Sequence, residues 1–400
     1  MASDQRPAAS GQQPATSSQP ATIWSAGATV VEALRAAGHQ AWLVGGCVRD
    51  RLLARPLKDA DVATSAEPEE VERLFPRTVA VGKAFGVVKV IGEGVDVEVA
   101  SLRADDRYID GRRPVAVRRG TLQEDAERRD LTVNALYADP DGTVTDPVGG
   151  LADLHARVLR GIGDPAARLA EDRLRVLRVL RFAAVLGFAI EERTAAAVRA
   201  TAIDGVARER VLDELSKAAH AGAAGAFLRG CAAHGQLAAV APCSAPEAAA
   251  VLLDRLGPVG LDLALAAWLL PGGSDAANAW MVMQPAAAAA RRSVPWLIAT
   301  APRLGVLPVA ERRRALRRPD GAACAALAAA IDPAGARDYV TWAGLDAEPE
   351  ACPVTASDLL AAGVPQGPEL GRRLRLIEDA WLSGAASDRA TLLAVGGKTG

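Results

Sequence analysis

The chain has few cysteines and no long apolar run. Its 400 residues include 5 cysteines at wide, irregular spacings without a CxxC pair. This pattern argues against a zinc site and against a disulfide framework, and it fits a reducing cytoplasm. No apolar stretch approaches the roughly 18 residues that a membrane span requires, and the N-terminus lacks the basic start and apolar core of a secretory signal. We therefore expect a cytoplasmic protein without a membrane segment.

Two nucleotide-binding signatures are also missing. No GxxxxGK[ST] loop occurs, and no GxGxxG motif marks a dinucleotide-binding fold. The formal net charge of -2 argues against a globally basic nucleic-acid coat protein, although it leaves room for a local basic surface. With 50% hydrophobic residues, the chain has enough apolar material for the cores of more than one domain.

The periodicity changes near Asp164. Before that residue, short strand patterns alternate with helical ones; beyond it, strand signals almost vanish and Ala, Leu and Arg predict a string of helices. The fold class expected is therefore α+β, with a mixed sheet followed by helices. Strands are expected at 41–46, 59–64, 87–92, 95–101 and 131–139, helices at 23–38 and 65–75, a disordered tail at 1–22 and a mobile polar loop at about 104–124.

Carboxylates recur in two of the strand patterns. Successive side chains of a strand point to opposite faces, so Asp59 and Asp61 project together, as do Asp96 and Glu98. Two carboxylates in one small site repel each other unless a cation lies between them, and hard oxygen ligands suit magnesium carried on nucleotide phosphates. With a third carboxylate from a neighbouring strand, this pattern indicates two-metal phosphoryl transfer. The alternative is that Asp59 and Asp61 cap a turn while Glu98 is solvated.

A glycine pair, Gly45-Gly46, ends the first buried strand and precedes a helix. Backbone N–H groups and the positive end of a helix can hold phosphate at such a turn. Arg49 follows one turn later and can reach a phosphate oxygen, which leaves Asp50 for an internal pair. The alternative is that the glycines serve only the turn.

A row of arginines follows on the helix expected after Asp164. Asp172 and Arg175 are three residues apart and hence neighbours on one face, while Arg178 and Arg181 continue a slanted row. An Asp–Arg pair can accept from an exocyclic amine and donate to the ring atom beside it, a pattern that cytosine and adenine share. Uracil and guanine would leave both side chains mismatched. The alternative is a solvated helix face with i,i+3 pairs.

These motifs together resemble a known family. In order and spacing, GGCVRD, KDADVAT, VEVASLR, ERRDLTVNALY and EDRLRVLRVLRF are similar to motifs of the bacterial class of tRNA nucleotidyltransferases and poly(A) polymerases. The similarity covers residues 40–190 strongly and 353–374 more loosely. It implies a polymerase-beta-like nucleotidyltransferase head and an all-helical neck, body and tail. The domains implied are a tail at 1–22, the head at 23–146, a neck with the nucleotide-recognition helix at 147–205, and an RNA-binding body and tail at 206–400.

The resemblance also implies roles for individual residues. Asp59, Asp61 and Glu98 would be catalytic, with Asp59 and Asp61 as ligands of Mg²⁺ and Asp96 the less favoured third carboxylate. The nucleotide-binding residues implied are Gly45, Gly46, Arg49, Arg129, Asp130, Asn134, Asp172, Arg175, Arg178 and Arg181. In the family, a flexible loop corresponding to 104–124 helps the change from C to A addition. This chain has Leu131 where the family usually has Phe, and Ala100-Ser101 where it has Thr-Thr, but every charged position is intact.

The function implied is template-independent addition of C, C and A to the 3' end of tRNA from CTP and ATP, with release of pyrophosphate. A poly(A) polymerase, a partial enzyme adding only CC or only A, and an RNA-binding scaffold with a dead catalytic head remain alternatives. None of the 4 histidines is followed by Asp, so the metal phosphohydrolase domain of some relatives is not expected. The arginine runs at 312–318 and 371–375 are candidate RNA phosphate contacts, or solvated helix faces. No protein partner is implied.

Overall fold

The computed structural model describes residues 18–82, 86–92, 94–105, 117–285, 288–346 and 350–397. It divides into two compact units, the first formed by Met1–Arg175 with Phe188–Thr201 and the second by Val176–Gly187 with Ala202–Gly400. The finer boundaries expected at 146 and 205 stay a prediction. Most of the expected tail lies outside the described residues, but helix α1 already begins at Ser18 rather than at residue 23.

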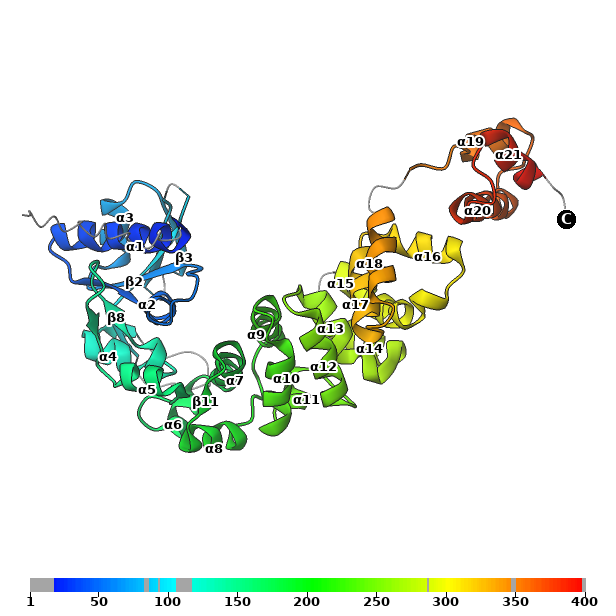
Figure 1. Cartoon of the computed structure of the whole chain (residues 1–400). Coiled ribbons are helices and arrows are strands. Elements are labelled where there is room, and N and C mark those ends of the chain that lie inside the picture. The colour runs from blue at the N-terminus through cyan, green and yellow to red at the C-terminus, as the bar shows by residue number, and fades with distance from the viewer. Residues whose placement is uncertain are drawn as a thin grey trace, which may run out of the picture. The chain divides into compact units, whose positions relative to one another are not determined.

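The first unit is built on a seven-stranded mixed sheet with the order β3-β4-β5-β2-β1-β8-β9 (Figure 1). Only β2 and β5 pair in parallel, and the other neighbours are antiparallel. The strands are β1 (Ala41–Val44), β2 (Ala60–Thr64), β3 (Thr78–Gly82), β4 (Val87–Val90), β5 (Val97–Ser101), β8 (Tyr137–Ala138) and β9 (Val144–Thr145). This mixed sheet, followed by helices, confirms the α+β class.

Helix α1 (Ser18–Ala36) packs on β1 and β2. Its Val31 and Leu34 are fully buried, as is Leu43 of β1. The approach is close enough that a Cβ on Gly27 would lie 2.8 Å from Leu43 Cδ2. The other helices of this unit are α2 (Gly46–Leu52), α3 (Pro68–Leu74), α4 (Leu122–Glu127), α5 (Gly150–Ala156), α6 (Pro165–Glu171) and α8 (Glu192–Ala200). A short parallel pair, β10 (Val158–Leu159) with β11 (Ala189–Ile190), joins its two segments.

The strand expected at 131–139 is mostly wrong. Thr132–Asn134 is a turn of 3-10 helix, and only Tyr137–Ala138 is a strand. The reason is local polar bonding, because the Asp130 carboxylate accepts from the backbone N–H of Leu131 and from the Asn134 amide. Such bonds compete with a strand ladder.

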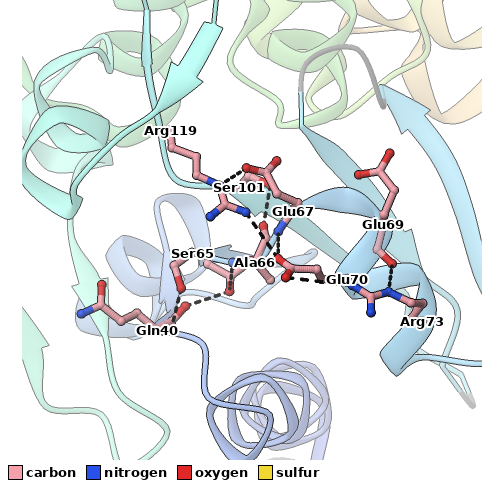
Figure 2. Close-up of polar contacts among 10 residues, drawn as sticks. Gln40, Ser65, Ala66, Glu67, Glu69, Glu70, Arg73, Ser101 and Arg119 are labelled. Carbon is pink, nitrogen blue, oxygen red and sulfur yellow. Dashed lines mark hydrogen bonds and ion pairs between the residues drawn. The ribbon is translucent and has the colours of Figure 1, made fainter.

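The polar segment expected to be a mobile loop has ordered arms. Residues 106–116 lie outside the described residues, but β6 (Arg103–Asp105) and β7 (Val117–Arg119) pair antiparallel on either side of them. Figure 2 shows that Arg119 is held at the N-terminus of α3, where it donates to Glu67 and pairs with Glu70 at 3.6 Å. A capping box from Thr121 then starts α4. The expected loop therefore extends too far at both ends.

The second unit contains helices and connecting loops, and no strand among its described residues. Its helices are most of α7 (Leu174–Leu186), then α9 (Arg208–His220), α10 (Ala224–Ala233), α11 (Leu237–Val240), α12 (Pro246–Leu256), α13 (Leu261–Leu269), α14 (Gly273–Val282), α15 (Ala288–Thr300), α16 (Val309–Leu316), α17 (Gly321–Ile331), α18 (Ala336–Leu345), α19 (Ala356–Ala361), α20 (Pro368–Ser383) and α21 (Arg389–Gly397). Phe227 and Trp268 are fully buried between them, with ring centroids 6.4 Å apart. None of the helices described is long and apolar enough to cross a membrane.

Candidate active site

Two carboxylates meet across the parallel pair of strands. In the β2–β5 ladder, Asp61 stands opposite Glu98, so both side chains lie on the same face of the sheet. Asp59 is the exposed residue directly before β2. Burial, and then repulsion from Asp59 and Glu98, raises the pKa of Asp61 to about 7, while Arg129 acts in the opposite direction. The site therefore concentrates negative charge where the sequence predicts it.

Asp96 takes a different position from the one expected. Strand β5 begins at Val97, so Asp96 lies directly before the strand, as Asp59 lies directly before β2. Unlike Asp59, however, Asp96 does not contribute to the raised pKa of Asp61. Glu98 itself is exposed, with Lys89 of β4 opposite it on the other side. The structure thus brings Glu98 next to Asp61 and gives no such register to Asp96.

The carboxylates of Asp59, Asp61 and Glu98 can supply some, but not all, of the ligands that a hard divalent cation needs. Among the described residues, no group of three His, Cys, Asp or Glu side chains is close enough together to hold a metal ion. Magnesium usually retains water and takes one or two carboxylates together with substrate phosphates. A cation would also relieve the repulsion that raises the pKa of Asp61. The donor chemistry therefore fits Mg²⁺ delivered with a nucleotide.

The glycine pair forms a turn whose first position, Gly45, favours glycine. Gly45 has φ of 77°, in the left-handed region, and Gly46 starts α2. A Cβ on Gly45 would also lie 3.3 Å from Arg129 Nη1. The Gly45 N–H itself donates to the Leu136 carbonyl at 3.0 Å. The turn thus brings the bare backbone of Gly45 against an arginine.

Arg49 is buried, and its known contacts are within the protein. Its guanidinium donates to both carboxylate oxygens of Asp50, at 2.9 and 3.0 Å, and to Asn134 Oδ1 at 2.5 Å. The Asn134 amide in turn donates to Asp130. The expected internal pair with Asp50 is present. Four residues from two distant motifs therefore form one polar network behind the glycine turn.

A second network surrounds Arg129, and sequence reasoning missed its central residue. Arg129 donates through Nε and Nη2 to Asp125, which is only 1% exposed and also accepts from Arg128 and from the Tyr137 hydroxyl. Burial alone would raise the pKa of Asp125, but Arg129 and Arg128 hold it below its usual value. The missed signal is the spacing, because Asp125 precedes Arg128 and Arg129 by three and four residues.

The helix expected after Asp164 is interrupted at Asp172. Helix α6 ends at Glu171 and α7 begins at Leu174. Asp172 has extended backbone angles, and its carboxylate accepts from the Leu174 N–H at 3.1 Å, as a helix N-cap does. The expectation that Asp172 and Arg175 share one helix face is therefore wrong, because capping the new helix takes Asp172 out of helical geometry.

The arginines of α7 are engaged inside the protein. Arg175 donates to Glu171, to the Arg168 carbonyl and to the Arg128 carbonyl, at 2.8, 2.9 and 2.9 Å. Arg178 and Arg181 belong to the second unit, where both approach the ring of Phe182. Arg181 also donates to the buried Glu214 at 2.5 Å.

A mixed sheet with carboxylates on two adjacent strands, beside a glycine turn and an arginine, is the arrangement that phosphoryl transfer by a nucleotidyltransferase requires. Residues 41–160 match the family model of the poly A polymerase head domain. The resemblance stated from the motifs is thereby confirmed for this part of the chain. Enzymes of this class generally use a divalent metal ion.

Several curated relatives share the N-terminal half. The CCA-adding enzyme of Anoxybacillus flavithermus is 45% identical over 192 residues, which cover 47% of this chain and 48% of that enzyme. The CCA-adding enzyme of Bacillus velezensis is 48% identical over 170 residues, or 42% of this chain and 43% of the relative. The chain thus spans about half the length of the curated relatives it matches.

Solved structures resemble nearly the whole chain. The CCA-adding enzyme of Bacillus stearothermophilus, in complex with CTP, is 26% identical with a TM-score of 0.77, covering 96% of this chain and 97% of that one. The Thermotoga maritima CCA-adding enzyme complexed with tRNA_CCA is 18% identical with a TM-score of 0.68, covering 94% and 95%. The second likeness concerns the fold alone.

Proposed function

We propose that this chain adds C, C and A, in that order, to the 3' end of tRNA in the cytoplasm, using CTP and ATP and releasing pyrophosphate. The observation that carries the proposal is the register of Asp61 opposite Glu98, beside Asp59 and Arg129. Phosphoryl transfer needs in-line positioning and charge neutralisation more than a covalent nucleophile, and this site consists of carboxylates and arginines.

In this proposal Asp59 and Asp61 hold Mg²⁺ together with the triphosphate, and Glu98 is the third carboxylate. The metal, when bound, supplies charge neutralisation of the phosphates and lowers the pKa of the attacking hydroxyl. The RNA 3' hydroxyl attacks the α-phosphorus, its proton is lost, and the bond to the pyrophosphate breaks. Arg129 and the Gly45–Gly46 backbone would face the phosphates, while Arg49, Asp130 and Asn134 hold the turn in shape.

Base selection by Asp172 and Arg175 also remains part of the proposal. An Asp–Arg pair suits the donor–acceptor pattern that cytosine and adenine share. Because Arg175 donates to Glu171 and to two carbonyls, base reading requires Arg175 to exchange at least one of these contacts for the base. Contacts from Arg178 and Arg181 are proposed on the resemblance alone.

The second unit offers a basic cavity for RNA phosphates. Arg314 and Arg375, one from each arginine run, line a cavity of about 450 Å³ together with Arg303, Arg318 and Trp296. Arg314 has acidic partners in Glu378 and Asp379, and Arg313 and Arg317 both donate to the buried Asp346. The candidate phosphate contacts of the two runs therefore narrow to Arg318 and Arg375, which line this cavity.

The test is incubation of the purified protein with magnesium, a tRNA transcript lacking its 3' CCA, and labelled CTP or ATP, singly and together. We expect three added residues, two C and one A, resolved at single-nucleotide length. A transcript that binds but is never extended would overturn the proposal in favour of an RNA-binding scaffold.

Poly(A) synthesis is the second candidate, favoured by the match to the poly A polymerase head domain. It predicts a long A tract with ATP alone. A stop after CC, or a requirement for a CC-ended transcript, would instead indicate a partial enzyme.

A further inference from the structure

Asp125 accepts hydrogen bonds from three side chains of the first unit. Its Oδ1 accepts from Arg128 Nε at 2.8 Å and Nη2 at 2.5 Å. Its Oδ2 accepts from Arg129 Nε at 3.2 Å and Nη2 at 3.0 Å, and from the Tyr137 hydroxyl at 2.6 Å. With an exposure of 1%, the group can contact neither nucleotide nor RNA. Asp125 can therefore affect the reaction only through the side chains that it contacts.

One of these groups is Arg129, which the proposed function places beside the nucleotide phosphates. With Nε and Nη2 occupied by Asp125, the remaining Nη1 of Arg129 is directed at the glycine turn, 3.4 Å from the Asn134 carbonyl. It lies so near Gly45 that a Cβ there would be 3.3 Å away. Arg129 is also close enough to Asp61 to oppose the rise of its pKa. Asp125 thus fixes the direction in which Arg129 presents its charge.

The other group is Arg128, which contacts Arg175, the arginine that the proposed function assigns to base selection. Arg128, held through its side chain by Asp125, accepts a hydrogen bond from Arg175 Nη2 on its carbonyl oxygen at 2.9 Å. Helix α4 supplies Asp125, and the same short stretch of backbone supplies both arginines. A single buried carboxylate therefore connects Arg129 and Arg175, the two arginines to which the proposed function gives different tasks.

We propose that Asp125 is a positioning residue. It holds Arg129 against the glycine turn and, through Arg128, fixes the position of the Arg175 guanidinium group. The inference rests on the proposed function. Two guanidinium groups need an acceptor with charge and four lone-pair sites, which a carboxylate provides and an amide does not. A displacement of about 1 Å at a positioning contact can lower the rate about a hundredfold.

The primary test compares Asp125→Asn with Asp346→Asn at saturating tRNA. Asp346 is a matched control, because it is 3% exposed and also accepts from two arginines, but in the second unit. We expect Asp125→Asn to lower kcat/KM for both CTP and ATP about a hundredfold, whereas Asp346→Asn should change it less than about twofold despite a similar loss of thermal stability. Wild-type kcat/KM in Asp125→Asn would overturn the proposal.

A double-mutant cycle separates positioning from general stability. Because Asp125 acts partly through Arg129, the loss of kcat/KM caused by Asp125→Asn should be smaller in an Arg129→Ala background than in the wild type, although Asp125→Asn still lowers the melting temperature. Fully additive losses of kcat/KM would contradict the inference. Tyr137→Phe removes one donor from Asp125 and leaves both arginine contacts, so we expect KM values for CTP and ATP within about threefold of wild type.

Asp125→Glu is the second test variant, to be used if Asp125→Asn does not fold. It keeps the charge and displaces the carboxylate by one methylene, so the KM for CTP and ATP should rise about tenfold while the KM for tRNA is unchanged. Unchanged nucleotide KM would overturn the inference. In every arm the wild-type protein must first extend tRNA, since failure there would reject the proposed function and not the role of Asp125 alone.

Discussion

Arginine is used differently in the two units. In the first, Arg49 and Arg129 are largely buried, and both donate to Asn134, which accepts through its side chain and through a carbonyl beside Gly45. In the second, arginines mostly connect one helix to another. Arg229 of α10 pairs with Glu247 and Asp254 of α12.

The same connecting role explains most of the run at 312–318. Arg314 of α16 pairs with Glu378 and Asp379 of α20, and Arg313 donates to Asp346 after α18. An arginine-rich segment therefore does not by itself indicate an RNA surface. What distinguishes the two uses is the position of the acidic partner. In the second unit the partner mostly lies on another helix and connects the two helices, whereas Asp50 and Asp125 lie within four residues of Arg49 and Arg129 and hold these guanidinium groups beside the glycine turn.

The largest effect should come from the carboxylates that only the first unit supplies. Asp59→Ala should lower nucleotide addition at least about a thousandfold while tRNA binding is retained, because the phosphates lose a metal ligand. Asp96→Asn is the matched control and should stay within about twofold, since Asp96 also lies directly before a strand but, unlike Asp59, does not contribute to the raised pKa of Asp61. Single-turnover addition and a filter-binding assay check both; unchanged addition by Asp59→Ala would reject the metal assignment.

The next effect concerns the glycine turn. Gly45→Ala should reduce kcat/KM about a hundredfold, because the residue has positive φ and its Cβ would displace Arg129. Gly38→Ala separates the two causes, since Gly38 also has positive φ but no atom near the position of its Cβ. We expect Gly38→Ala to destabilise the fold by about 1 kcal/mol and to leave kcat/KM unchanged. If both variants lost kcat/KM to the same extent, backbone strain and not the displacement of Arg129 would explain the loss.

A third prediction concerns stability against pH without metal. The raised pKa of Asp61, about 7, means that the stability due to this group is full below about pH 4 and is lost as pH rises through 7. Asp61→Asn should therefore raise the free energy of unfolding by about 2 kcal/mol at pH 8 and by little at pH 4, although it abolishes activity. Urea unfolding with a chelator measures this difference, and its absence at pH 8 would show that Asp61 is not crowded by Asp59 and Glu98.

The smallest effect should come from a connecting arginine of the second unit. Arg229 is partly exposed, as are Glu247 and Asp254, so Arg229→Ala should reduce the free energy of unfolding by less than about 1 kcal/mol. Neither the KM for nucleotide nor the KM for tRNA should change. A large rise in the KM for tRNA would show that Arg229 faces RNA and would weaken the contrast between the two units.

Local sequence patterns correctly predicted the strands that show alternating apolar and polar residues and the turn that contains the glycine pair. The strand patterns at 59–64 and 95–101 correspond to β2 and β5, and the glycine pair follows β1 and begins α2. Prediction failed where a polar side chain bonds to nearby backbone. Asp172 caps α7 and breaks a helix that periodicity extends through it, and Asp130 favours a 3-10 turn over a strand. Such side-chain bonds compete with regular structure without changing the hydrophobic pattern.

By itself the sequence determined the residue types of the site, the order of its motifs and the change from a mixed sheet to helices, because spacing and periodicity are local properties of a chain. Only the tertiary structure decided which charges meet. The parallel pairing of β2 and β5 places Glu98 beside Asp61, and the packing of α4 against the site turns Asp125 from an unremarked acidic residue into the acceptor for two arginines. Pairing and packing join segments far apart in the chain, and burial then sets the strength of each charge contact.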